Sequence, residues 1–125
     1  HSRKVGADLH TWDVHKLIRL SRSLAVEDVP LTAIAEIDEL WWFQDADDIP
    51  TPRSIADHMS LVQQADLSYP IILCVEGRVM DGMHRTVKAL LLDLGAVPAV
   101  QFSETPKPDF VNVDVTQLPY PDEDV

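Results

Sequence analysis

An apolar run at residues 71–75 constrains the fold of this chain more than any other segment. The run is short and rich in β-branched side chains, which indicates a buried strand. The Glu76-Gly77 pair that follows predicts a tight turn, and residues 78–80 predict a second, shorter strand that pairs back. Asp81-Gly82 breaks that strand. The segment therefore predicts a hairpin in the core, with Cys74 as a core residue.

A helix is predicted directly after the hairpin, from about residue 83 to residue 94. Gly95 stands where a C′ glycine belongs, and residues 97–102 predict a closing strand. Four apolar side chains fall at the spacing of one buried helical face: Val87, Leu90, Leu91 and Leu94.

The N-terminal part predicts an extra helix ahead of this unit, over residues 12–24, with Thr11 as its N-cap. Residues 27–30 are expected to be a connector. Residues 31–37 are expected to be a strand, because they are short, mixed in propensity and bracketed by a proline and acidic residues.

A further helix is expected to begin at Thr51 or Pro52, since a proline in the first turn of a helix costs no hydrogen bond. It is expected to fade near residues 64–66. The preceding residues 45–52 form a predicted loop, and the prolines after residue 104 predict an extended tail. The expected buried face of the helix consists of Ile55, Met59 and Val62.

The chain is acidic, which bears on its partners. Its 125 residues carry 10 Lys and Arg against 21 Asp and Glu, a formal net charge of −11. Proteins that bind duplex DNA on their own present clustered basic residues, whereas the basic residues here are scattered. Autonomous DNA binding is therefore not expected. A small phosphate ligand remains compatible with the charge, because a few local donors outweigh a distant negative field.

Length and composition narrow the class further. A chain of 125 residues supports one domain, and its single cysteine, Cys74, excludes an internal disulfide. No apolar run approaches the roughly 20 residues of a membrane span. No secretory segment begins the sequence, so a cytoplasmic protein without a membrane partner is expected.

The most informative chemistry lies at the start of the helix at residue 83. Gly82 permits a sharp turn and close approach of a ligand to the backbone, and the free N–H groups of a helix start attract anions. His84 and Arg85 add donors that suit a phosphate. Each cation opposes the helix dipole by roughly 0.3–1 kcal/mol, so its placement favours an anionic ligand. An alternative stays open: Arg85 pairs with Asp81 or another acid, and His84 is a half-buried structural residue.

The order of these elements, with the motif Asp81-Gly82-Met83-His84-Arg85, resembles the ParB/sulfiredoxin-like superfamily over roughly residues 30–102. The resemblance implies a single small α+β domain with a short mixed sheet and packed helices, which holds nucleotide phosphates at the helix start. Members include chromosome-partitioning proteins that bind CTP, sulfiredoxins that use ATP, and a free-serine kinase.

The motif most resembles the serine-kinase branch. Sulfiredoxins carry a catalytic cysteine where this chain has Met83, and partitioning proteins carry a glutamate where it has His84. Partitioning proteins also continue into a helix-turn-helix domain, for which no segment after residue 102 is suitable. The resemblance implies a general base near Asp38 and Glu39, which cannot be told apart by alignment.

The combined interpretation divides the chain into an N-terminal helical extension (residues 1–29), a ParB/sulfiredoxin-like domain (30–104) and an extended, acidic, Pro-rich tail (105–125). Its function is expected to be that of a nucleotide-dependent phosphotransferase or phosphohydrolase acting on a small hydroxyl compound, with ATP, ADP or CTP and Mg²⁺. A non-catalytic nucleotide-sensing or DNA-partitioning-associated module is the alternative, and nuclease activity is disfavoured by the acidic charge. The expected catalytic residues are Asp38, Glu39 and Asp81, with Asp81 also as the metal ligand; the expected nucleotide-binding residues are Gly82, Met83, His84, Arg85, Thr86, Arg53 and Ser54.

Three adjacent aromatic residues, Trp41, Trp42 and Phe43, form the other unusual feature. Neighbouring side chains of a strand point to opposite faces, so the three cannot all point inward. Two are expected in the core. The third is expected to serve a homodimer interface, another partner surface or a lid over the ligand.

Overall fold

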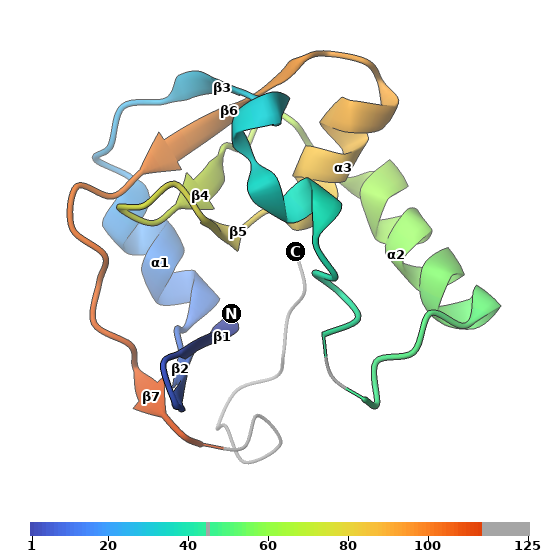
Figure 1. Ribbon diagram of the computed structural model, residues 1–125. Coiled ribbons are helices and arrows are strands. Elements are labelled where there is room, and N and C mark those ends of the chain that lie inside the picture. The colour runs from blue at the N-terminus through green and yellow to red at the C-terminus, as the bar shows by residue number, and fades with distance from the viewer. Residues whose placement is uncertain (45, 114–125) are drawn as a thin grey trace.

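The computed structural model describes residues 1–44 and 46–113 of this chain. They form a small α+β domain with two sheets and three α-helices (Figure 1). The loop residue Asp45 and residues 114–125 of the predicted tail lie outside the described residues. None of the described helices is long and apolar enough to span a bilayer.

The central sheet has the strand order β3-β6-β4-β5. Its strands are β3 (Glu27–Pro30), β4 (Ile71–Leu73), β5 (Val79–Asp81) and β6 (Ala96–Gln101). β4 and β5 form the predicted hairpin, and β6 is the predicted closing strand within one residue. β6 runs parallel to β4 and antiparallel to β3, so the sheet is mixed, as expected.

The sheet is covered on both faces, which explains why each of residues 71–74 is apolar and buried; Val75, at the following turn, is exposed. Ile71 and Leu73 belong to one core cluster together with α3 (Met83–Leu91), whereas Ile72 and Cys74 belong to a second cluster with α1 (Val14–Ser21). Successive residues of a strand point to opposite faces, so a strand buried on both faces needs an apolar residue at every position. The prediction that Cys74 is a core residue is confirmed, since its side chain is fully buried.

A second, three-stranded sheet was not predicted. It consists of β1 (Ser2–Val5), β2 (Asp8–Thr11) and β7 (Phe110–Val111), in the order β1-β2-β7. Figure 1 shows this sheet beside α1, on the opposite side of the molecule from α2 (Pro52–Gln64) and α3. The N-terminal region therefore contains a hairpin as well as the predicted helix.

The predicted strand at residues 31–37 is wrong. Two short 3₁₀ helices, η1 (Leu31–Ala33) and η2 (Ala35–Asp38), occupy this segment. The backbone N–H of Ile34 donates to Leu31 O and that of Ile37 to Ile34 O. In a 3₁₀ helix residues three apart lie on one side, so these three apolar residues, which follow a period of three, face the core together. The first strand of the sheet is β3, in the segment predicted as a connector.

Helix boundaries differ from the prediction at α1. The helix begins at Val14 because Asp13, rather than Thr11, is the N-cap; its carboxylate accepts the backbone N–H of His15. Thr11 instead belongs to β2. The helix also ends at Ser21, three residues earlier than predicted.

α2 begins as predicted, with Thr51 as its N-cap and Pro52 in the first turn. Its predicted buried face is only partly correct, since Val62 is buried but Ile55 and Met59 are exposed. The end of α2 is held instead by a cation, because Lys88 Nζ donates to the carbonyl oxygens of Gln63 and Ala65 at 3.0 and 2.6 Å.

The predicted buried face of α3 is wrong. The helix ends at Leu91, and Asp93, with φ of 57°, takes the left-handed position that was predicted for Gly95. The leucines at positions 90, 91 and 94 are exposed and Val87 is half-buried. The buried side chains are two apolar and three polar ones, all but one in the first half of the helix: Met83, Ala89, His84, Arg85 and Thr86.

Asp109 joins the segment before β7 to α1. Its carboxylate accepts the backbone N–H of Asp13 and the Lys16 ammonium, each at 2.8 Å. Burial raises the pKa of Asp109, but these two hydrogen bonds together with the positive charges of Lys16 and Arg19 lower it by more, so the pKa lies below its usual range.

We expect the substitution Asp109→Asn to lower the free energy of unfolding by about 1 kcal/mol at pH 7. A depressed folded-state pKa stabilises the fold above the unfolded-state value of about 3.9, and this contribution is lost as the pH falls through the folded value. Urea unfolding at pH 7 and pH 3 should therefore show a difference between wild type and variant that is smaller at the lower pH. The exposed control Glu104→Gln should differ from wild type at neither pH, and a difference for Asp109→Asn that is as large at pH 3 as at pH 7 would contradict the assignment.

Candidate functional site

The start of α3 lacks the side chains that usually complete a helix N-terminus. Its N-cap is Gly82, which has φ of 108° and ψ of 26° and no side chain to accept a backbone N–H. The first turn contains no acidic residue. His84 and Arg85 stand there instead, so the end of the helix that carries a partial positive charge also carries basic side chains.

Arg85 is held by an acid from the preceding strand. Its Nη2 donates to Asp81 Oδ2 at 2.8 Å, and only 10% of the Arg85 side chain and 8% of the Asp81 side chain are exposed. The Nε donor of Arg85 is buried and has no hydrogen-bond partner among residues 1–44 and 46–113. The alternative considered from the sequence, an Asp81–Arg85 pair, is therefore present, but it leaves one donor of the guanidinium unused.

Gly82 serves internal packing rather than an open approach to the backbone. A Cβ atom at this position would lie 2.6 Å from Ile71 Cγ2 and 2.9 Å from Arg85 Nη2. The space next to Gly82 is thus filled by side chains of the protein itself. On this side of Gly82 no space is open for a ligand to approach the backbone.

Thr86 stabilises the turn between β5 and α3 through its hydroxyl group. It is fully buried, and its hydroxyl donates to Gly82 O at 3.0 Å, the same oxygen that accepts the Thr86 backbone N–H. Thr86 therefore fixes the turn into α3. Met83, the first residue of the helix, lines the pocket described below.

His84 lies in an aromatic stack that joins α3, α2 and the loop before α2. Its Nε2 is 3.0 Å from His58 Nδ1, so one ring donates a hydrogen bond to the other, and His84 is only 2% exposed. The Trp42 ring stacks on both, with centroid distances of 4.2 Å to His58 and 4.8 Å to His84. Phe43 meets the edge of His58 at 5.8 Å. Trp42 and Phe43 thus cover the histidine pair.

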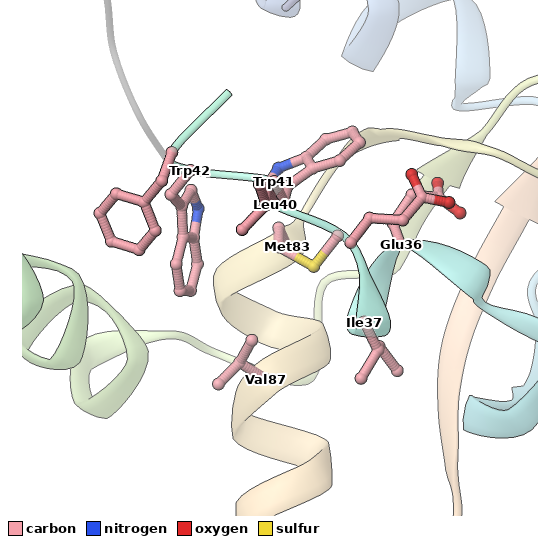
Figure 2. Close-up of a pocket in the computed structure, with 9 residues that line it drawn as sticks. Glu36, Ile37, Leu40, Trp41, Trp42, Met83 and Val87 are labelled. Atoms are coloured by element: carbon pink, nitrogen blue, oxygen red, sulfur yellow. The ribbon is translucent and has the colours of Figure 1, made fainter. Parts of the chain in front are cut away.

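A pocket of about 190 Å³ lies next to this stack, between η2, the Trp41–Phe43 segment and α3. Figure 2 shows Met83 at its centre, with Glu36 on one side, Trp42 on the other, and Val87 and Ile37 below. Its lining combines three aromatic rings, four aliphatic or thioether side chains and two carboxylates: Trp41, Trp42, Phe43, Ile37, Leu40, Met83, Val87, Glu36 and Glu39.

The sequence did not single out Glu36, although its carboxylate is the buried one in this region. Its side chain is 2% exposed and accepts the backbone N–H of Val79 in β5. In a 3₁₀ helix residues three apart share a side, which places Glu36 and Glu39 together. In a strand, Glu36 would lie on the same face as Asp38 rather than Glu39. The incorrect strand prediction therefore gave no indication that Glu36 belongs to the pocket.

The two predicted base candidates lie at the surface. Asp38 is exposed and does not line the pocket, while Glu39 lines it and accepts Arg78 Nη2 at 2.8 Å. This hydrogen bond raises the pKa of the Arg78 guanidinium above its usual range. Arg53 is exposed, and the backbone N–H of Ser54 donates to the Thr51 cap. Within the described part of the chain, no hydrogen bond or ion pair joins Arg53 or Ser54 to residues 81–85.

A metal site formed by the protein alone is not present in the described residues. No group of three or more His, Cys, Asp or Glu side chains in residues 1–44 and 46–113 is close enough to hold a cation. Asp81, the predicted metal ligand, is the partner of Arg85. Any divalent ion at Asp81 would therefore need further oxygen ligands from a bound molecule.

Comparison of the chain with protein-family models, with curated proteins and with solved structures finds no match. The function is therefore argued from the site itself.

We expect Gly82→Ala to lower the free energy of unfolding by roughly 3 kcal/mol or more, because the added Cβ is both strained and overpacked against Ile71. Gly6→Ala is the matched control, since Gly6 also has a positive φ, of 62°, but an added Cβ would meet nothing within 4 Å. Its expected cost is roughly 1 kcal/mol. Urea unfolding of both variants measures the difference, and equal losses would show that the Gly82 corner is not tightly packed.

Proposed function

We propose that this domain binds the phosphate groups of a nucleotide at the start of α3 and uses the nucleotide, with Mg²⁺, for phosphotransfer or phosphate hydrolysis. The observation that supports the proposal is the unused Nε donor of Arg85, buried beside a helix N-terminus that has no side-chain cap. The motif at residues 81–85, which resembles that of the ParB/sulfiredoxin-like superfamily, agrees with it.

Two costs in the ligand-free protein favour an anion at this place. Leaving a buried donor without a partner costs about 1–3 kcal/mol, and more for a charged group. A basic residue in the first turn of a helix opposes the helix dipole. A phosphate group would offset both, because it accepts hydrogen bonds from the guanidinium and its negative charge is stabilised by the positive end of the helix dipole.

The negative charge of Asp81 opposes the binding of a phosphate beside Arg85. In the ligand-free protein Asp81 holds Arg85, and a phosphate would have to share that guanidinium with a carboxylate of the same charge. Mg²⁺ commonly binds one or two carboxylates together with substrate phosphates, and it would neutralise the repulsion between Asp81 and the ligand. Nucleotide binding is therefore expected to require Mg²⁺.

The pocket beside Met83 is the proposed site for the acceptor. Glu36, which lines the pocket, accepts the backbone N–H of Val79, and Val79 lies two residues, or roughly 7 Å of strand, before Asp81 on β5. Phosphotransfer needs a carboxylate near the attacking oxygen. Glu36 and Glu39 line this pocket and Asp38 does not, so the structure favours the first two for that role.

We expect wild-type protein to bind ATP, ADP or CTP in the presence of Mg²⁺, and Arg85→Lys to weaken that binding about 10–100-fold. Lysine keeps the charge opposite Asp81 but removes the Nε–H donor and the planar guanidinium, so the fold is retained. Titration calorimetry with and without EDTA measures both effects.

The control for this experiment is Arg19→Lys, an exposed residue of α1 that should leave nucleotide affinity unchanged. Arg85→Ala is a poorer test, because it would strand a buried Asp81 and destabilise the fold. Absence of nucleotide binding by the wild-type protein, or equal affinity of Arg85→Lys and wild type, would refute the proposed site.

A non-catalytic nucleotide sensor is the second candidate, favoured by the exposure of Asp38 and by the engagement of Glu39 with Arg78. Incubation of nucleotide and Mg²⁺ with a panel of small hydroxyl compounds separates the two. Steady product formation that is lost in Glu36→Gln supports the enzyme. Tight binding without turnover supports the sensor.

A further inference from the structure

The pocket next to Met83 has a lining that selects against anions. Its walls are mainly aromatic and aliphatic, and the charged side chains among its lining residues are Glu36 and Glu39; the indole N–H groups of Trp41 and Trp42 are the neutral polar groups (Figure 2). None of the described residues that line it is a lysine, arginine or histidine. A phosphate or carboxylate group placed here would meet two like charges and no cationic partner, which opposes binding.

The charges beside the pocket sum to one unit of negative charge. Glu39 is paired with Arg78, while Glu36 accepts a neutral backbone N–H from Val79. Arg78 also lies close enough to Glu36 for the two charges to attract, but a single guanidinium cannot neutralise two carboxylates. One monovalent cation would restore neutrality in this half-enclosed site.

The uncharged side chains of the lining indicate which apolar group the ligand carries. Faces of tryptophan and phenylalanine rings attract organic cations, and the adjoining Ile37, Leu40, Met83 and Val87 side chains favour an apolar body. A volume of about 190 Å³ exceeds the roughly 150 Å³ of a cavity that accommodates benzene. The pocket is therefore large enough for one ring and a short chain.

We propose that this pocket binds an organic amine in its protonated form, with the ammonium group toward Glu36 and Glu39 and a ring-sized apolar group against Trp41, Trp42 and Met83. The site differs from the phosphate site at the start of α3, since it is lined by carboxylates and by the Met83 side of that helix. Within the proposed phosphotransfer it would hold the acceptor, but binding of the amine needs no nucleotide.

The test uses three probe molecules and nucleotide-free protein. Phenethylamine carries the ring and the cation, phenylacetate replaces the cation by an anion on a similar frame, and ethylamine lacks the ring. Phenethylamine is expected to shift the NMR signals of the Trp41 and Trp42 indole N–H groups and the Met83 amide in a saturable manner. The Leu17 amide, in the other core cluster, serves as an internal reference and should not shift.

Both alternative probes should bind at least about tenfold more weakly than phenethylamine. Equal binding of phenylacetate would overturn the charge assignment, and equal binding of ethylamine would overturn the role of the rings. Shifts spread over the acidic surface, without saturation at Trp41 and Trp42, would show a general attraction of cations to this chain and would also overturn the proposal.

Two variants address the pocket from different sides. Glu36→Gln keeps an acceptor for the Val79 N–H but removes the charge, and it should weaken phenethylamine about tenfold. Val87→Phe fills the pocket without changing any charge and should abolish the saturable shifts. The control Glu27→Gln, on the exposed edge strand β3, should leave them unchanged. If phenethylamine binds equally to all three variants and wild type, the pocket is not its site, whether or not the protein binds nucleotides.

Discussion

The contact between Asp81 and Arg85 fixes the corner on which the candidate site depends. It joins the end of β5 to the first turn of α3 across Gly82, and both side chains are almost fully buried. Gly82 has no Cβ, so Ile71 and the guanidinium can close over the turn. Two buried charges in contact cost desolvation energy, which only a well-positioned partner offsets. The pair leaves the buried Nε–H of Arg85 without a hydrogen-bond acceptor. This missing acceptor is the physical basis of the proposed phosphate site.

The packing around that corner explains why polar residues occupy the buried face of α3. His84 and Arg85, in the first turn of the helix, point inward and form hydrogen bonds with His58 and Asp81 respectively. One turn later, Lys88 donates to a carbonyl oxygen at the end of α2. The four leucines that follow remain at the surface. A helix with this arrangement is not stabilised by its apolar stripe alone, so a substitution on its polar face acts on α2, β5 and the Trp42 loop together.

The sequence predicted the part of the fold that depends on local patterns. The hairpin, the helix after Gly82, the closing strand and the start of α2 at Thr51 were all predictable, because turn residues and capping signals act within a few positions. The segment at residues 31–37 was not, since shortness, mixed propensity and a flanking proline do not distinguish a strand from 3₁₀ turns; the period of three in Leu31, Ile34 and Ile37 is the signal that does. The general base was expected near Asp38 and Glu39 from the resemblance, and the predicted strand gave no reason to single out Glu36. The pairing of His58 with His84 joins residues 26 positions apart, which no local pattern encodes.

The two proposed sites follow from opposite electrostatics on adjoining sides of one helix start. At Arg85 one donor of a cation lacks an acceptor, and near Glu36 and Glu39 a single guanidinium, that of Arg78, pairs with Glu39 alone. A strongly acidic chain repels anions at long range, but the field of distant charges is screened within about 10 Å, whereas buried groups act at contact distance. The proposed sites would therefore select ligand groups by charge. A phosphate would bind at the helix start beside Arg85, and a cation would bind on the Met83 side, beside the carboxylates. A molecule, or a pair of molecules, with a negative group at Arg85 and a positive group near Glu36 and Glu39 would therefore bind both sites at once. The ion pairs Asp81–Arg85 and Glu39–Arg78 each neutralise charge at one site only.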